Sequence, residues 1–198
     1  MLYFLYMQTN ELRDELVKII EGDVSIDDAD LEKAARDTSL FYVKPRIVVF
    51  PKHKDDVQKL VAFVAKKKQE GVDVSLSARS AGTCMTGGSL TESIVFETTR
   101  YMNHVTDVTD KEAKSEPGVY YRDFEPHTLE KGWIMPSYPA SRELAAIGGI
   151  ISNNSGGEKT LIYGKTERYI KELEVVYANG ETDTLRALNH DELQAKIN

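Results

Sequence analysis

The most informative run in this sequence is Arg79-Ser80-Ala81-Gly82-Thr83-Cys84-Met85-Thr86-Gly87-Gly88, and the segment 147–157 (IGGIISNNSGG) is a second run of the same kind. Both consist mainly of Gly, Ala, Ser, Thr and Asn and follow an apolar or proline-marked segment. Such runs expose backbone N–H groups and let a ligand approach the main chain closely. Two of them in one chain indicate a large anionic ligand held at two places, as a dinucleotide is held.

Composition bounds the class of protein. The chain has 198 residues, of which 41% are hydrophobic, enough for one sizeable domain or two small lobes. A net charge of −7 argues against nucleic-acid binding, which needs a basic face. The single cysteine, Cys84, excludes a disulfide framework and favours a reducing, cytoplasmic compartment. The apolar run 1–7 is too short to be a signal peptide or a membrane span, so it is an arm that packs on a partner or an upstream extension.

Hydrophobic periodicity predicts alternating helices and strands. The segments 46–50 and 72–76 read as strands on either side of a helix over 54–70, an order that predicts a parallel unit with a right-handed crossover. The first glycine-rich run then begins at the carboxyl end of the second strand, where open α/β sheets bind ligands. The remaining predictions are helices at 10–21, 27–37, 120–131 and 190–197, strands at 93–97, 171–178 and 181–185, a hairpin within 104–116 and a helical turn at 142–147.

The first run matches neither common phosphate motif. It lacks the Lys-Ser/Thr that closes a Walker A loop, and it lacks the spacing of a Rossmann fingerprint. Gly82, Gly87 and Gly88 supply positive φ or close approach, the amides of residues 80–83 form a nest for a diphosphate, and Ser80 and Thr83 add hydroxyl donors. Taken alone, the run fits an ordinary surface turn equally well.

The second run favours a ligand-binding loop over an ordinary surface turn. Gly148 and Gly149 follow the apolar Ile147, which predicts buried backbone in close approach. Asn153 and Asn154 then bring amide side chains that can donate to and accept from a heteroaromatic ring edge. A structural turn rarely needs so many consecutive special residues.

Taken in order, these motifs resemble the vanillyl-alcohol-oxidase-type (PCMH-type) FAD-binding domain, and most closely the branch of FAD-linked D-lactate dehydrogenases and glycolate oxidase subunits. The resemblance covers about residues 37–185. It is carried by Ala78-Arg79-Ser80-Ala81-Gly82-Thr83 with Gly87-Gly88, Pro139-Ala140-Ser141, Ile147-Gly148-Gly149, Ser152-Asn153-Asn154-Ser155-Gly156-Gly157, Tyr163-Gly164, and Leu173-Glu174-Val175-Val176 with Asn179-Gly180.

The resemblance implies an α+β (α/β) fold of two lobes that hold an extended FAD between them. A helical arm over 1–36 precedes a small parallel α/β lobe over 37–100, and a mixed-sheet lobe follows over 101–198. The cofactor-binding residues implied are Arg79, Ser80, Ala81, Gly82, Thr83, Cys84, Gly87, Gly88, Pro139, Ala140, Ser141, Gly148, Gly149, Ser152, Asn153, Asn154, Gly156, Gly157, Gly164, Val175 and Val176.

Attachment of the cofactor is predicted to be non-covalent. Some members of the family bind FAD through a His in the first run, where this sequence has Thr83. Cys84 beside it could in principle attack the flavin, but a small packing residue is the better interpretation. None of the four histidines pairs with another at ligand spacing, so no metal is predicted.

The predicted function is that of the FAD-binding portion of an oxidoreductase that passes hydride from a small 2-hydroxy acid to FAD and electrons on to an unknown acceptor. Family members carry a substrate-binding cap that supplies the general base, and the sequence ends before it, so we expect a truncated piece that is inactive alone, with catalytic residues unknown. Two alternatives stay open: a non-catalytic FAD-binding subunit of a larger assembly, and an enolpyruvyl-reductase-like flavoenzyme.

Overall fold

A four-stranded sheet organises the first half of the molecule, of which the computed structural model describes residues 7–197. The strands lie in the order β1-β2-β4-β3; β2 and β3 both run parallel to β4, and β1 is antiparallel to β2. Their bounds are β1 Asp23–Ser25, β2 Ile47–Phe50, β3 Leu76–Arg79 and β4 Ile94–Glu97. The predicted parallel unit therefore exists, but β4 lies between its two strands.

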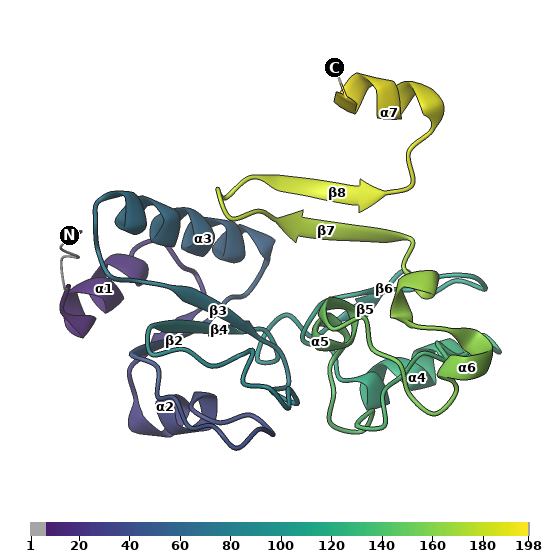
Figure 1. Cartoon of the computed structure of the whole chain (residues 1–198), viewed down its shortest axis with the longest axis horizontal. Helices are drawn as coiled ribbons and strands as arrows, with labels where there is room; N and C mark the ends of the chain where they lie inside the picture. The colour runs from purple at the N-terminus through teal and green to yellow at the C-terminus, as the bar shows by residue number, and fades with distance from the viewer. Residues whose placement is uncertain (1–6, 198) are drawn as a thin grey trace.

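Helices cover both faces of this sheet (Figure 1). Alternate residues of the fully buried β2 point to opposite faces: Ile47 and Val49 pack with α1 (Thr9–Leu16) and α3 (Lys54–Gln69), while Val48 and Phe50 pack with α2 (Asp28–Ala34). Burial on both faces explains why β2 reads as a continuous apolar run rather than an alternating one.

The N-terminal helices pack on the sheet. Leu12 and Leu16 of α1 are fully buried in the same cluster as Ile47, and β1 extends the sheet itself. Of the apolar run 1–7, residues 1–6 lie outside the described residues.

The strand predicted at 72–76 is wrong by four residues. Val72 and Val74 are buried as its alternation requires, but the observed strand is Leu76–Arg79. Pairing with β4 begins at Leu76 opposite Ile94, because β4 itself starts there. The partner strand, not the local pattern, sets where β3 begins.

The second half of the molecule has its own apolar core. Tyr121 and Phe124 of α4 pack with Ile147 and Ile150 of α5 and with Tyr138. The elements of this half are β5 Val105–Thr106, β6 Lys114–Ser115, α4 Tyr121–Leu129, α5 Ile147–Ser152, α6 Thr160–Tyr163, the 3-10 helix η1 Thr166–Tyr169, β7 Glu172–Val176, β8 Thr182–Arg186 and α7 His190–Ile197.

Two antiparallel pairs, β5 with β6 and β7 with β8, supply the strands of this half, so the predicted hairpins are present. The second glycine-rich run differs from the loop that was predicted. Its first six residues form the helix α5. Where a helical turn was expected at 142–147, the structure has a turn over residues 140–144, just before α5. The observed architecture is α+β, with one core on each side of the segment that links the halves.

Candidate functional site

The two glycine-rich runs meet at the carbonyl oxygen of Pro117. Ser80 of the first run donates its hydroxyl to this oxygen at 2.8 Å. Gly148 of the second run donates its backbone N–H to the same oxygen at 2.9 Å. A Cβ placed on Gly149 would lie 3.9 Å from the Cβ of Ser80. The fold thus brings together two segments that are far apart in sequence.

The first run has backbone amides that make no hydrogen bond within the described residues. Thr38 holds the run from behind: its N–H donates to the Cys84 carbonyl at 3.1 Å, and its hydroxyl lies 3.0 Å from the Thr83 and Cys84 carbonyls. Within residues 7–197, the amides of Ala81 and Gly82 and that of Thr83 have no hydrogen-bond acceptor. These three amides are consecutive, and the middle residue, Gly82, has a positive φ. Such a group of free N–H donors is typical of an anion-binding nest, so this run fits a diphosphate.

The side chain of Arg79 is buried beneath the first run. Arg79 is the last residue of β3 and is only 7% exposed. Its guanidinium donates to the Arg36 carbonyl at 2.8 Å and pairs with the Glu97 carboxylate at 3.9 Å. This side chain is therefore turned inward, and a contact of Arg79 with the cofactor stays a prediction. The Ser80 hydroxyl, predicted as a ligand donor, is likewise used within the protein.

Several predicted glycines approach protein backbone rather than empty space. A Cβ on Gly148 would lie 2.7 Å from the Pro117 oxygen, and one on Gly157 would lie 2.2 Å from the Tyr138 oxygen. Close approach at Gly148 is thus confirmed, but its neighbour is the chain itself. Gly149, exposed in the first turn of α5, is the glycine of this run that faces the first run with space to spare.

The Asn-rich end of the second run ties α5 to η1. The Asn154 side-chain oxygen accepts the Glu167 N–H at 3.0 Å, and the Ser155 carbonyl accepts the Thr166 hydroxyl at 2.8 Å. The predicted contact of Asn154 with a ring edge therefore competes with a structural bond. Asn153 and Ser152 are exposed.

The remaining predicted residues occupy three places. Pro139 lies against Gly157, whose Cβ would be 3.3 Å from its Cα, while Ala140 and Ser141 are exposed in the following turn. Gly156 and Gly164 flank α6, and Gly87 and Gly88 close the first run.

Val175 and Val176 lie in β7, which pairs with β8 and packs on α3. Figure 1 shows this hairpin set apart from α5. The structure does not bring these two valines to the junction of the runs.

Cys84 lies at the turn of the first run. Its sulfur contacts the Thr86 hydroxyl at 3.3 Å and accepts the Gly88 N–H at 3.4 Å. The bond from Thr86 is the main cause that lowers the pKa of the Cys84 thiol below its ordinary value. The thiol therefore has partners within the run that holds it.

Two residues important to the junction escaped the sequence analysis. Pro117, which receives both runs, was visible only as the start of a proline-glycine pair. Thr38 stands in a segment, Asp37-Thr38-Ser39, that fits the resembled family, but no role at the junction was predicted for it, because a hydroxyl that bonds carbonyls more than forty residues away leaves no local pattern.

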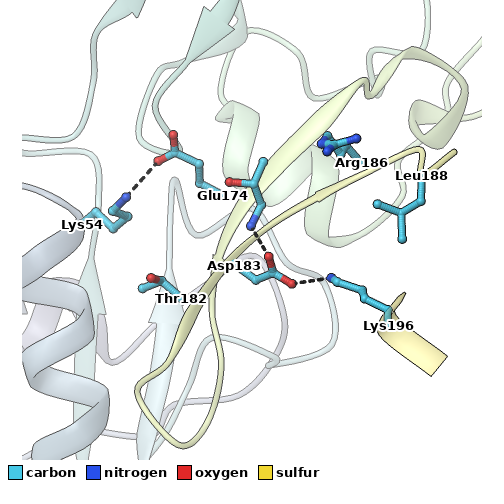
Figure 2. Close-up of a pocket in the computed structure, with 8 residues that line it drawn as sticks. Lys54, Glu174, Thr182, Asp183, Arg186, Leu188 and Lys196 are labelled. Carbon is cyan, nitrogen blue, oxygen red and sulfur yellow. Dashed lines mark hydrogen bonds and ion pairs between the residues drawn. The ribbon is translucent and has the colours of Figure 1, made fainter. Parts of the chain in front are cut away.

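A separate cavity of about 410 Å³ lies between α3, the β7–β8 hairpin and α7 (Figure 2). Four of its charged groups pair with one another: Lys54 with Glu174 at 3.6 Å and Lys196 with Asp183 at 2.8 Å. None of the predicted site residues lines it, so it is not the site built by the glycine-rich runs.

Metal and membrane features were sought in residues 7–197. No group of three or more His, Cys, Asp or Glu side chains there could hold a metal ion. In the same residues, no helix combines the length and apolar character needed to cross a bilayer.

A two-lobed α+β fold with a nest of free amides where two glycine-rich runs meet defines a domain that binds a nucleotide cofactor. The sequence pattern of the family described as "FAD binding domain" matches residues 45–186. The chain therefore belongs to this family, and its cofactor is FAD, as the resemblance implied.

Similarity to known proteins agrees with the assignment of the chain to this family. The chain is 28% identical to a glycolate oxidase subunit GlcD of Bacillus subtilis, over 88% of this chain and 37% of that protein. It is 31% identical to a D-2-hydroxyglutarate dehydrogenase of Stutzerimonas stutzeri, over 91% and 38%. A solved alkyldihydroxyacetonephosphate synthase, 21% identical, matches with a TM-score of 0.77 over 94% of this chain and 38% of its own, which confirms the predicted fold. The curated relatives are longer, and the chain spans between 16% and 38% of those matched here.

Proposed function

We propose that this chain is the FAD-binding portion of a cytoplasmic oxidoreductase that oxidises a small 2-hydroxy acid. Support comes from relatives named as a glycolate oxidase subunit, D-2-hydroxyglutarate dehydrogenases and a D-lactate dehydrogenase. The acid in each of these three names has a hydroxyl group on the carbon next to a carboxylate. A separate electron acceptor would reoxidise the flavin.

The observation that carries the proposal is the nest of free amides at the junction of the runs. The amides of Ala81, Gly82 and Thr83 would hold the diphosphate, and Gly149 would leave room for the cofactor to cross α5. Bound FAD supplies a two-electron acceptor, while the protein positions it and excludes water. The substrate-carboxylate ligands and the general base belong to the rest of such an enzyme.

The FAD is proposed to be held without a covalent bond. Thr83 stands at the position where a His would attach it, and no His occurs between residues 54 and 103. The sulfur of the neighbouring Cys84 is occupied by Thr86 and by the Gly88 amide.

A flavin titration tests the binding half of the proposal. The ligand-free chain should quench FAD fluorescence on binding, and denaturation should release all of the flavin into the supernatant. No binding at high micromolar FAD would reject an intact site, and flavin retained on the denatured chain would reject non-covalent attachment.

Reduction of the flavin tests the catalytic half. The full-length protein that contains this chain should lose its visible flavin absorbance when D-lactate, glycolate or D-2-hydroxyglutarate is added without oxygen. A flavin that binds but is reduced by none of these acids would instead support a non-catalytic FAD-binding subunit.

A further inference from the structure

We propose that the buried Arg79–Glu97 pair is a positioning device that holds the first glycine-rich run in its anion-binding form, with Arg79 acting through Gly82 and not by touching the cofactor. This inference rests on the proposed role of that run in binding the FAD diphosphate. The two side chains are buried below the run, they contact each other, and the guanidinium fills the space beside Gly82.

Both residues end neighbouring parallel strands. Arg79 closes β3, Glu97 closes β4, and the two stand opposite each other in the register of the sheet. They are 7% and 3% exposed. A buried pair at the carboxyl edge of the sheet lies directly below the run that leaves β3, so its geometry is transmitted to that run.

Arg79 supports the turn at Gly82. The φ of Gly82 is +70°, and a Cβ placed there would lie only 2.2 Å from an Arg79 terminal nitrogen. The guanidinium therefore fills the space where any larger residue would need to go. A second terminal nitrogen donates to the Arg36 carbonyl at 2.8 Å, which fixes the plane of the group between the run and the segment after α2. A planar fork can make both contacts at once, whereas an ammonium cannot.

Glu97 holds Arg79 in place. Its carboxylate faces the Arg79 guanidinium at 3.9 Å and accepts bonds from Lys33 at 2.9 Å and from the Thr99 hydroxyl at 2.6 Å. Removing one partner of a buried pair leaves the other charge uncompensated. Lys33, by contrast, is 60% exposed and contributes less because water screens it. Lys33 therefore offers a matched control that contacts Glu97 but not the run.

Hydrogen exchange of the ligand-free chain tests the structural part of the inference. Arg79→Lys keeps the charge but loses the fork, so the Thr38 and Gly88 amides, which both donate to Cys84 of the run, should exchange about tenfold faster than in the wild type, as expected for the loss of one charge-assisted hydrogen bond. Lys33→Gln should change their exchange less than about twofold. Equal exchange in Arg79→Lys and wild type, or an equal increase in Lys33→Gln, would overturn the inference.

FAD affinity tests its functional part. Arg79→Lys should raise the Kd for FAD and the inhibition constant of competing ADP together by about tenfold, since both contain the diphosphate, while Lys33→Gln leaves both near wild type. If Arg79→Lys does not fold, Glu97→Gln, which keeps the side-chain shape, should weaken both ligands in the same ratio. Weaker FAD binding with ADP unchanged would refute the assignment to the diphosphate run. A wild-type chain that binds no FAD would reject the proposed function, and the exchange experiment would still decide the role of Arg79.

Discussion

Neighbouring glycines of α5 are predicted to respond in opposite ways to the same substitution. A Cβ on Gly148 would lie 2.6 Å from the Pro117 Cβ and 2.7 Å from its oxygen, so Gly148→Ala forces two segments apart. A Cβ on Gly149 meets only the Ser80 Cβ at 3.9 Å, which is ordinary contact. Both residues are helical, so both substitutions gain the same local helix propensity.

The magnitudes follow from this difference. Replacing a helical glycine by alanine stabilises by about 0.5–1 kcal/mol, which is all that Gly149→Ala should show. For Gly148→Ala the same gain is outweighed by overpacking, about 1–3 kcal/mol, and by weakening of the bond to the Pro117 carbonyl, about 1 kcal/mol. The gain in helix propensity cancels, so the two variants should differ by about 2–4 kcal/mol, or roughly 4–16 °C in Tm for a chain of this size.

Thermal unfolding and a flavin titration together provide the assay. Gly149→Ala should unfold at or above the wild-type temperature yet bind FAD more weakly, since its methyl group enters the space between the runs. Gly148→Ala should lose stability first. Equal Tm values for the two variants would refute the packing argument, and full FAD affinity in Gly149→Ala would refute the path of the cofactor across α5.

Three further outcomes are expected. Asp56 is fully buried and its carboxylate accepts three backbone amides, so Asp56→Asn should lower the free energy of unfolding in urea by about 3 kcal/mol, and a change below about 1 kcal/mol would contradict this. Thr86→Val removes the main cause that lowers the pKa of Cys84, so alkylation by iodoacetamide at pH 8 should slow; an unchanged rate would reject that cause. Arg186 and a backbone amide lower the pKa of Glu192 to about 2. A carboxyl with a depressed pKa stabilises the fold above the unfolded value of about 4.3, and this stabilisation is lost as the pH falls toward 2. The protection of the α7 amides, corrected for the pH dependence of intrinsic exchange, should therefore fall across that window, but not in Glu192→Gln.

The sequence by itself determined the elements whose signals are local. The apolar run of β2 and the helical spacing of α3 depend on burial of their own side chains, and both were predicted within a residue or two. The two glycine-rich runs were likewise visible, because backbone freedom and exposed amides are properties of residue type. The order of these motifs along the chain resembles the FAD-binding family, and that resemblance implied the cofactor and the two-lobed α+β fold.

Tertiary structure decided which residues of the runs face a ligand. β3 begins at Leu76 because β4 begins opposite it, and Arg79 turns inward because Glu97 lies across the sheet. Gly148 approaches Pro117, since the segment between β6 and α4 passes there. Residue type shows that a backbone can be approached closely, whereas the neighbour that approaches it comes from distant parts of the chain. Only the folded molecule therefore separates the backbone amides that are left without an acceptor from the side chains that are bonded within the protein.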